Sequence, residues 1–115
     1  MKEEKFKVIQ FIREFIIKLD KELDNFPKKD IDIKARIRDE SYNLLELAYK
    51  ANSITDNDYK NRLLDESIAK LKVIDFLINL SYDKQIIPNK RYLKLGYTLD
   101  NITKYMTGWK KNINN

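Results

Sequence analysis

Residues 88–113 read PNKRYLKLGYTLDNITKYMTGWKKNI, and the spacing of their large apolar side chains decides the fold. These side chains recur at steps of three and four without interruption: Tyr92, Leu95, Leu99, Ile102, Met106, Trp109 and Ile113. That spacing predicts one helix with a continuous apolar stripe that packs against a core. Pro88 suits the first turn of such a helix, where its missing N–H donor costs little. Leu99 and Ile102 lie mid-stripe and are expected to be buried.

The net positive charge of the chain is concentrated in the same segment. Residues 87–115 contain six Lys or Arg and one acid, Asp100, whereas residues 1–86 contain 17 basic and 17 acidic residues. A second row points away from the apolar stripe and consists of Lys90, Lys94, Tyr97, Asn101, Lys104, Gly108 and Lys111. One helix can therefore anchor the core with one side and present unneutralised positive charge with the other.

Three earlier segments show the same helical periodicity. The predicted helices span residues 2–25, 28–52, 56–84 and 88–113. The first ends at Phe26, because a residue before proline is disfavoured in the helical region. Thr55 or Asp56 is expected to cap the third, with Asp58 in its first turn. Helices of similar length joined by short links predict an all-α, antiparallel up-down-up-down four-helix bundle, with residues 1–115 as a single domain.

The first helix has a wider apolar arc than a single core contact requires. One row of large apolar residues comprises Phe6, Ile9, Ile12, Ile16, Leu19, Leu23 and Phe26, and a second set comprises Val8, Phe11, Phe15 and Ile17. In one interpretation the helix lies centrally against several neighbours. In the other, part of the arc contacts another subunit, since large exposed apolar patches usually mark interfaces. Both interpretations are open at the level of sequence.

The composition excludes several classes of active site. The chain contains no His and no Cys, and its only glycines are Gly96 and Gly108. Ser–His and Cys–His nucleophile pairs, a Glu-x-x-His di-iron site and a glycine-rich phosphate loop are therefore absent. We expect no enzyme activity, no cofactor and no metal. No apolar run approaches 18 residues and the N-terminus lacks a signal-peptide core, so we expect a cytoplasmic protein without a membrane partner.

Three aromatic residues of the last predicted helix could contact nucleic acid. Trp109 lies on the apolar stripe beside Met106, so it is expected to pack in the core. Tyr97 and Tyr105 lie off the stripe among lysines, where they could stack on the bases of a single strand. The alternative for both tyrosines is ordinary amphipathic surface.

Several short motifs resemble those of a known family. They are FPK at 26–28, IRD at 37–39, LLELAYKAN at 44–52, LLDE at 63–66 and GW at 108–109. With these motifs, nearly the whole chain resembles the small four-helix-bundle proteins of the accessory variability determinant type, which are found with diversity-generating retroelements. The same superfamily includes the proteins encoded in intervening sequences of bacterial 23S ribosomal RNA genes. Thr107 departs from the pattern, because family members often have two glycines before the Trp.

The resemblance implies a homopentameric barrel of four-helix bundles with a basic surface. It also implies binding to RNA or DNA and to a reverse transcriptase, in support of mutagenic copying of a template RNA during retrohoming. An alternative is a structural homo-oligomer of the ribosomal intervening-sequence type, whose basic face binds RNA or an acidic protein partner. Net charge by itself does not distinguish these two functions.

The candidate nucleic-acid-binding residues are basic side chains that could neutralise backbone phosphates. Such contacts do not depend on the base sequence. The main set is Lys90, Arg91, Lys94, Lys104, Lys110 and Lys111. A secondary set precedes or lies within the second predicted helix and comprises Lys28, Lys29, Lys34, Arg36 and Arg38. Asp39 and Glu40 follow the secondary set directly, so much of its charge is expected to be neutralised.

Overall fold

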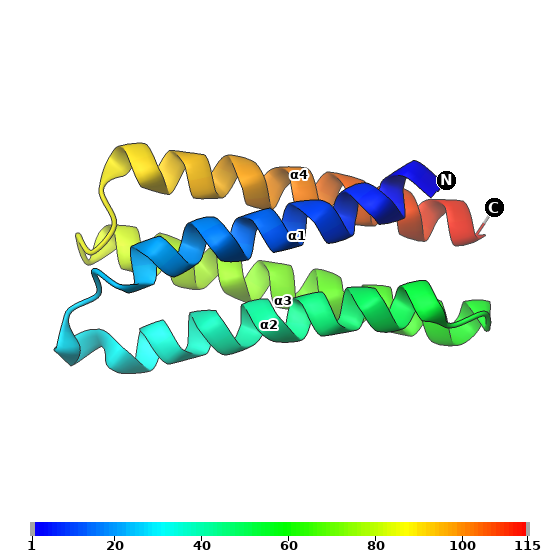
Figure 1. Cartoon of the computed structure of the whole chain (residues 1–115), viewed down its shortest axis with the longest axis horizontal. Coiled ribbons are helices and arrows are strands. Elements are labelled where there is room, and N and C mark those ends of the chain that lie inside the picture. The colour runs from blue at the N-terminus through cyan, green and yellow to red at the C-terminus, as the bar shows by residue number, and fades with distance from the viewer. Residues whose placement is uncertain (1, 115) are drawn as a thin grey trace.

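The computed structural model describes the backbone of residues 2–114 and the side chains of residues 5–113. This part of the chain folds into four helices and one short 3-10 turn (Figure 1): α1 Lys2–Leu23, η1 Lys28–Asp30, α2 Ile31–Ser53, α3 Asn57–Asp83 and α4 Asn89–Asn114. Successive helices run antiparallel, and both chain ends lie at the same end of the bundle. The predicted all-α, up-down-up-down four-helix bundle is confirmed.

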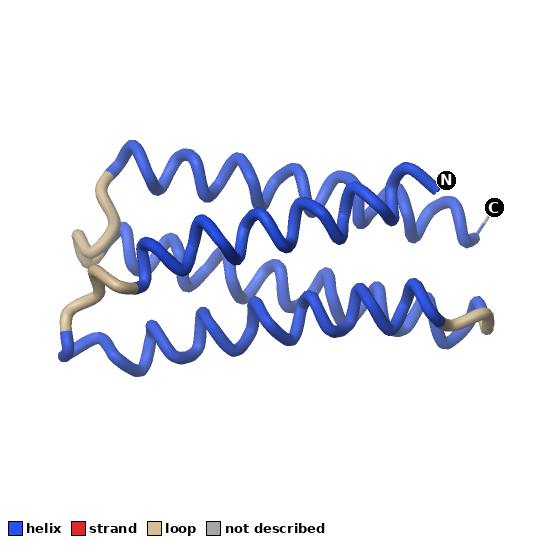
Figure 2. The backbone as a smooth tube through the Cα atoms, in the orientation of Figure 1, coloured by secondary structure: helices blue, strands red, loops and turns tan. Residues whose placement is uncertain are grey.

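The helices are arranged as a square around one core. α1 packs against α2 and α4, and α3 packs against the same two helices, while the backbones of the two diagonal pairs stay farther apart. The link between α1 and α2, which contains η1, and the link between α3 and α4 lie at one end, and the link between α2 and α3 lies at the other (Figure 2). The bundle, 44 × 23 × 19 Å overall, therefore has four long outer surfaces, each formed by two neighbouring helices.

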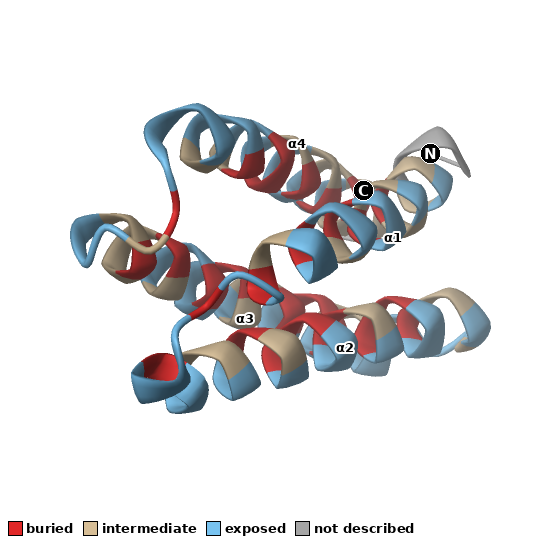
Figure 3. Ribbon diagram, turned by 60° about the vertical axis from the view of Figure 1, so that its left-hand side comes forward, coloured by how far each residue is buried: buried red, intermediate tan, exposed pale blue. Residues whose placement is uncertain are grey.

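The core-facing side of α4 is the one that the apolar spacing predicts. Its buried side chains are Leu95, Leu99, Ile102, Met106 and Trp109, and Tyr92 and Ile113 at the two ends of the stripe are half-buried. Burial of the other helices is likewise confined to the side that faces the bundle axis (Figure 3). Leu99 and Ile102 are 3% and 0% exposed, which confirms the prediction for both, and Trp109 is a core residue.

The buried side of α1 differs from the row that sequence spacing emphasises. Its buried residues are Val8, Ile12, Phe15, Leu19 and Leu23, which combine members of both predicted sets. Phe6 and Ile17 are instead 60% and 63% exposed. The first row and the residues Val8, Phe11 and Phe15 of the second set all follow three-four spacing. The positions of α2 and α4 decide which of these side chains face the core. Part of the wide apolar arc therefore remains on the surface of the bundle.

The observed start of α2 differs from the predicted one, whereas that of α3 agrees with it. The sequence predicts a second helix from Lys28, but residues 28–30 form a separate 3-10 turn in which the Asp30 amide donates to the Pro27 carbonyl at 3.0 Å. Asp30 has φ −107° and ψ 24°, outside the helical region, so α2 begins only at Ile31. The third helix starts as predicted, because the Asp56 side chain accepts a hydrogen bond from the Asp58 amide at 3.1 Å.

The link between α3 and α4 is held by hydrogen bonds and by a tyrosine pair. Gln85 adopts φ 63°, and the amides of Gln85 and Ile86 donate to the Tyr82 and Ser81 carbonyls at 2.9 Å each, which is a Schellman closure of α3. The Tyr92 ring stacks on Tyr82 with centroids 4.1 Å apart, and its hydroxyl donates to Asn79. These contacts place the first turn of α4 against the last turns of α3.

Replacing Gly96 with alanine is expected to stabilise the protein. Gly96 lies inside α4, and a Cβ atom built there meets nothing within 4 Å. Glycine in a helix interior costs about 1 kcal/mol relative to alanine, and no clash opposes the gain here. Urea unfolding should give a free energy of unfolding about 0.5–1 kcal/mol higher for Gly96→Ala. A decrease would mean that another molecule packs closely against this position.

Candidate nucleic-acid interface

The six basic residues predicted on the last helix lie in different surroundings. Lys90, Arg91, Lys94, Lys104 and Lys111 are exposed, whereas Lys110 is half-buried and forms an ion pair with Asp65 of α3. Lys90 and Lys111 are separated by 21 residues of helix, about 30 Å along the axis. Lys110 and Arg91, which pairs with Glu22 of α1, are therefore partly neutralised, and the other four present charge along the whole length of α4.

Arg91 and Lys94 lie beside two lysines of α1 that sequence reasoning did not select. Lys18, Lys21, Glu22, Arg91, Lys94 and Leu95 line a groove of about 240 Å³ between α1 and α4. The charges of α1 are balanced along the sequence, so no local pattern distinguishes Lys18 and Lys21. Only the antiparallel packing of α1 on α4 brings the four cations together. We call this feature the α1/α4 basic groove.

The α1/α4 basic groove has a net excess of positive charge. Arg91 Nε lies 3.3 Å from Glu22 Oε1, and the Glu22 side chain is only 13% exposed. Lys18, Lys21 and Lys94 form no ion pair with any other side chain that the structure describes. Four cations against one carboxylate give an excess of three charges, which favours an anionic ligand and raises its local concentration.

Farther along the same pair of helices, Tyr105 is held in place by its neighbours. Its ring centroid lies 5.4 Å from that of Phe11, and the ammonium groups of Lys7 and Lys104 lie 5.1 and 5.6 Å from it. Tyr97, by contrast, is 70% exposed. The two tyrosines that sequence reasoning treated alike therefore differ, because only Tyr97 offers an open ring face.

The secondary set does not join this surface. Lys28 and Lys29 are exposed on η1, while Lys34, Arg36 and Arg38 lie on α2, a helix diagonally opposite α4. Arg36 Nε lies 3.3 Å from Glu40, which also pairs with Lys70 of α3 at 3.3 Å. Arg38 lines the seam between α1 and α2. The expected neutralisation is thus observed directly for Arg36.

The comparison with protein-family models adds an independent observation. Residues 3–113 match the family model described as bAvd-like, where bAvd denotes the bacterial accessory variability determinant. The chain belongs to this family. The resemblance that the motifs indicate is therefore confirmed over almost the whole bAvd-like chain. Searches of curated proteins and of solved structures found no match.

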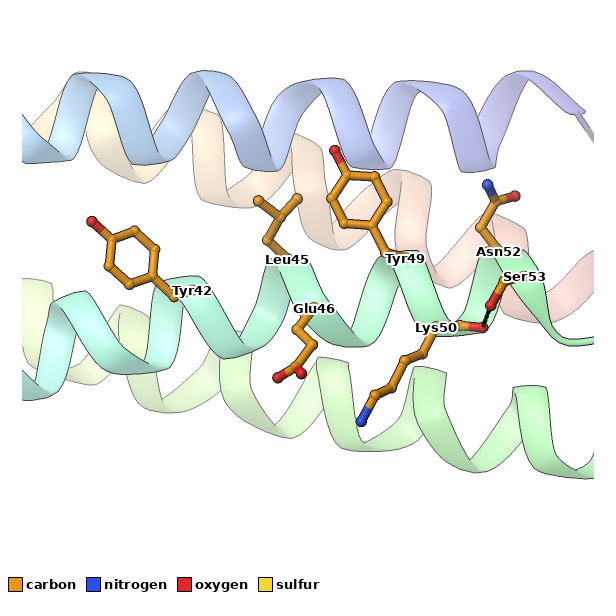
Figure 4. A pocket seen from close by; sticks show the side chains of 7 residues that line it. All are labelled: Tyr42, Leu45, Glu46, Tyr49, Lys50, Asn52 and Ser53. Atoms are coloured by element: carbon orange, nitrogen blue, oxygen red, sulfur yellow. Dashed lines mark hydrogen bonds between the residues drawn. The ribbon is translucent and has the colours of Figure 1, made fainter.

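The bAvd-like chain also has an apolar outer surface between α1 and α2. Phe6 and Ile17 of α1 and Tyr42 and Tyr49 of α2 are all exposed, by 45–63%. Two shallow hollows of about 550 and 740 Å³ adjoin at Tyr49 and Asn52 and include these four residues among their lining. In Figure 4, Tyr42, Leu45 and Tyr49 point toward α1, whereas Glu46 and Lys50 point toward α3. We call Phe6, Ile17, Tyr42, Leu45 and Tyr49 the α1/α2 apolar surface.

Two features are absent from the part of the chain that the structure describes. No group of three or more Asp, Glu, His or Cys side chains comes together in an arrangement that could hold a metal ion. Among the helices of residues 2–114, none combines the length and apolar character needed to cross a membrane.

Proposed function

We propose that this bAvd-like protein is a non-enzymatic, cytoplasmic accessory factor of a diversity-generating retroelement. It binds RNA or DNA through the basic surface centred on α4, and it holds a reverse transcriptase near its template during mutagenic retrohoming. Family membership supports the accessory role. The observation that best supports nucleic-acid binding is the α1/α4 basic groove, where Lys18, Lys21 and Lys94 lack an acidic partner among the described side chains.

The chemistry of this surface suits a phosphate backbone better than a sequence-reading contact. Lysine side chains are flexible point charges, and Arg91 can donate to two phosphate oxygens. Contacts of this kind hold the nucleic acid in place and are indifferent to base sequence. We therefore expect affinity to vary little between sequences and to fall steeply as salt rises.

The proposed active form is a homopentamer. The α1/α2 apolar surface supports self-association, because contiguous exposed apolar patches on a helical bundle usually mark a protein interface. It shares no lining residue with the α1/α4 basic groove, so we propose that covering the first surface leaves the second accessible. Each subunit of the ring then contributes one basic groove to a multivalent surface, which raises the overall affinity for a long chain of phosphates.

Neutralising Lys94 and Lys104 is expected to weaken nucleic-acid binding without unfolding the protein. Both residues are exposed on α4, and glutamine is well tolerated in helices. For a single strand, removing one lysine that binds a phosphate flattens the log–log dependence of affinity on salt by about 0.7. The measurement is fluorescence anisotropy of labelled single-stranded RNA and DNA across a salt series, with circular dichroism as the control for folding.

The matched control is Lys50→Gln with Lys72→Gln, which removes the same charge from exposed sites on α2 and α3. An unchanged salt dependence in the Lys94 and Lys104 variant, or no binding by the unmodified protein at low salt, would contradict the nucleic-acid role. An acidic protein partner would then be favoured. For the reverse-transcriptase role, the neighbouring genes are informative: a reverse transcriptase gene beside a template repeat supports it, and a position within a ribosomal RNA gene supports the intervening-sequence branch.

A further inference from the structure

We infer that the α1/α4 basic groove and Tyr97 together form a binding site for single-stranded nucleic acid. One backbone phosphate would lie among Lys18, Lys21, Arg91 and Lys94, and a neighbouring base would stack on the Tyr97 ring. The inference rests on the proposed function, and it adds two contributing residues from α1 and a preference for single strands over duplexes.

The dimensions and chemistry of the groove fit a phosphate group. At about 240 Å³ it is smaller than the roughly 300–1,000 Å³ typical of small-molecule pockets, so it suits one phosphate with part of its sugar. Leu95 at its floor is buried, and the polar lining consists of four cations and Glu22. A groove with charged walls on two different helices can surround an anion, whereas the lysines on one helix contact it from one side only.

Arg91 is oriented for such a contact by Glu22. The closest approach of the pair is between Glu22 Oε1 and Arg91 Nε, at 3.3 Å, and Arg91 has no second acidic partner among the described residues. The Nε edge of the guanidinium thus faces the protein. The two terminal nitrogens remain for a ligand, and a planar guanidinium can bind two phosphate oxygens at once. Because Glu22 is mostly covered, it holds Arg91 without closing the groove.

The exposed ring of Tyr97 is the feature that gives this site its expected preference for single strands over duplexes. It follows Lys94 by three residues, a rise of about 4.5 Å along α4, so a base next to the bound phosphate is within reach of its ring. The ring is 70% exposed, and no aromatic ring or cation of the described residues stacks on it. Bases in a duplex are already stacked on one another, whereas the bases of a single strand can stack on an exposed aromatic side chain.

The test for the α1 lysines is Lys18→Gln with Lys21→Gln, compared with the charge-matched control Lys50→Gln with Lys72→Gln. Affinity is measured by fluorescence anisotropy for an unstructured oligonucleotide of about 20 nucleotides, longer than the 4–16 nucleotides that such sites usually cover. Because both lysines face the same proposed phosphate, the salt dependence for the single strand should flatten by up to about 0.7, and the affinity at a fixed salt concentration should fall. The control pair should leave it near the value of the unmodified protein.

The test for stacking is Tyr97→Ala, compared with Tyr97→Phe and with Tyr59→Ala, a tyrosine on α3 that is 44% exposed. Loss of one stacked base weakens binding by about 1–3 kcal/mol, so Tyr97→Ala should lower single-strand affinity about fivefold or more. Duplex affinity should not change. Tyr97→Phe keeps the ring and should bind like the unmodified protein, as should Tyr59→Ala.

The results separate this inference from the proposed function. Suppose that Lys18→Gln with Lys21→Gln and Tyr97→Ala both behave like their controls, while Lys94→Gln with Lys104→Gln weakens binding. The proposed single-strand binding site is then wrong, and nucleic-acid binding by the basic surface of α4 is still supported. Equal loss of single-strand and duplex affinity in Tyr97→Ala would also overturn the single-strand preference. If the unmodified protein binds neither ligand at low salt, the proposed function and this inference both fail.

Discussion

Replacing Leu99 with alanine is expected to lower the free energy of unfolding by about 2–5 kcal/mol, the range for large-to-small substitutions in well-packed cores. Leu99 lies in the middle of α4 and is 3% exposed, with Ile102 and Met106 on the same buried side. Alanine would leave a cavity between α4 and the helices packed against it. The cost includes both the reduced burial of apolar surface and the weaker packing around that cavity.

Urea unfolding monitored by circular dichroism measures this effect, at a fixed protein concentration because self-association adds to apparent stability. Leu93→Ala is the control, since it makes the same chemical change in the same helix at a residue that is 59% exposed. The control should change stability by no more than about 0.5 kcal/mol. A decrease below about 0.5 kcal/mol for Leu99→Ala as well would mean that the assigned core side of α4 is incorrect.

The second large effect is expected on assembly. The unmodified protein should elute as a homo-oligomer, which we propose to be a pentamer, and Ile17→Glu with Tyr49→Glu should convert it to monomers. Both residues belong to the α1/α2 apolar surface, where they are 63% and 45% exposed in the single chain. Hot-spot residues at the centre of an interface typically cost at least about 2 kcal/mol each when they are truncated, and a buried unpaired carboxylate adds a desolvation cost. A decrease of about 2 kcal/mol in binding free energy raises a dissociation constant about 30-fold.

Light scattering after size exclusion at micromolar concentration gives the mass directly. Phe76→Glu provides the matched control, because Phe76 is 62% exposed and lies on α3, outside the α1/α2 apolar surface. If Phe76→Glu dissociates the oligomer and the double variant does not, the contact surface lies on another side of the bundle. A mass of one chain for the unmodified protein would exclude the proposed pentamer altogether.

The periodicity of apolar residues was enough to predict the class of fold and most helix boundaries. Three-four spacing identifies a helix wherever one residue per turn is apolar, so the stripe from Tyr92 to Ile113 predicted both α4 and its buried side. Local hydrogen bonding is similarly predictable from sequence, as the Asp56 cap illustrates. The predicted start of α2 was wrong, because the turn at Lys28–Asp30 is also helical but is closed by an i→i−3 hydrogen bond, and the backbone angles of Asp30 separate it from α2.

Tertiary structure alone decided which side of α1 is buried and which charges act together. The apolar arc of α1 is wider than its buried side, and only the positions of α2 and α4 select Phe15 for the core and leave Ile17 outside. Lys18 and Lys21 become part of a basic groove because Arg91 and Lys94, some 70 residues later, pack beside them. Lys110 is paired for the same reason, through Asp65 on a different helix. The electrostatic potential at a surface depends on the distances between charges in space. These distances are fixed only when the helices pack, so the order of charges along the sequence does not reveal them.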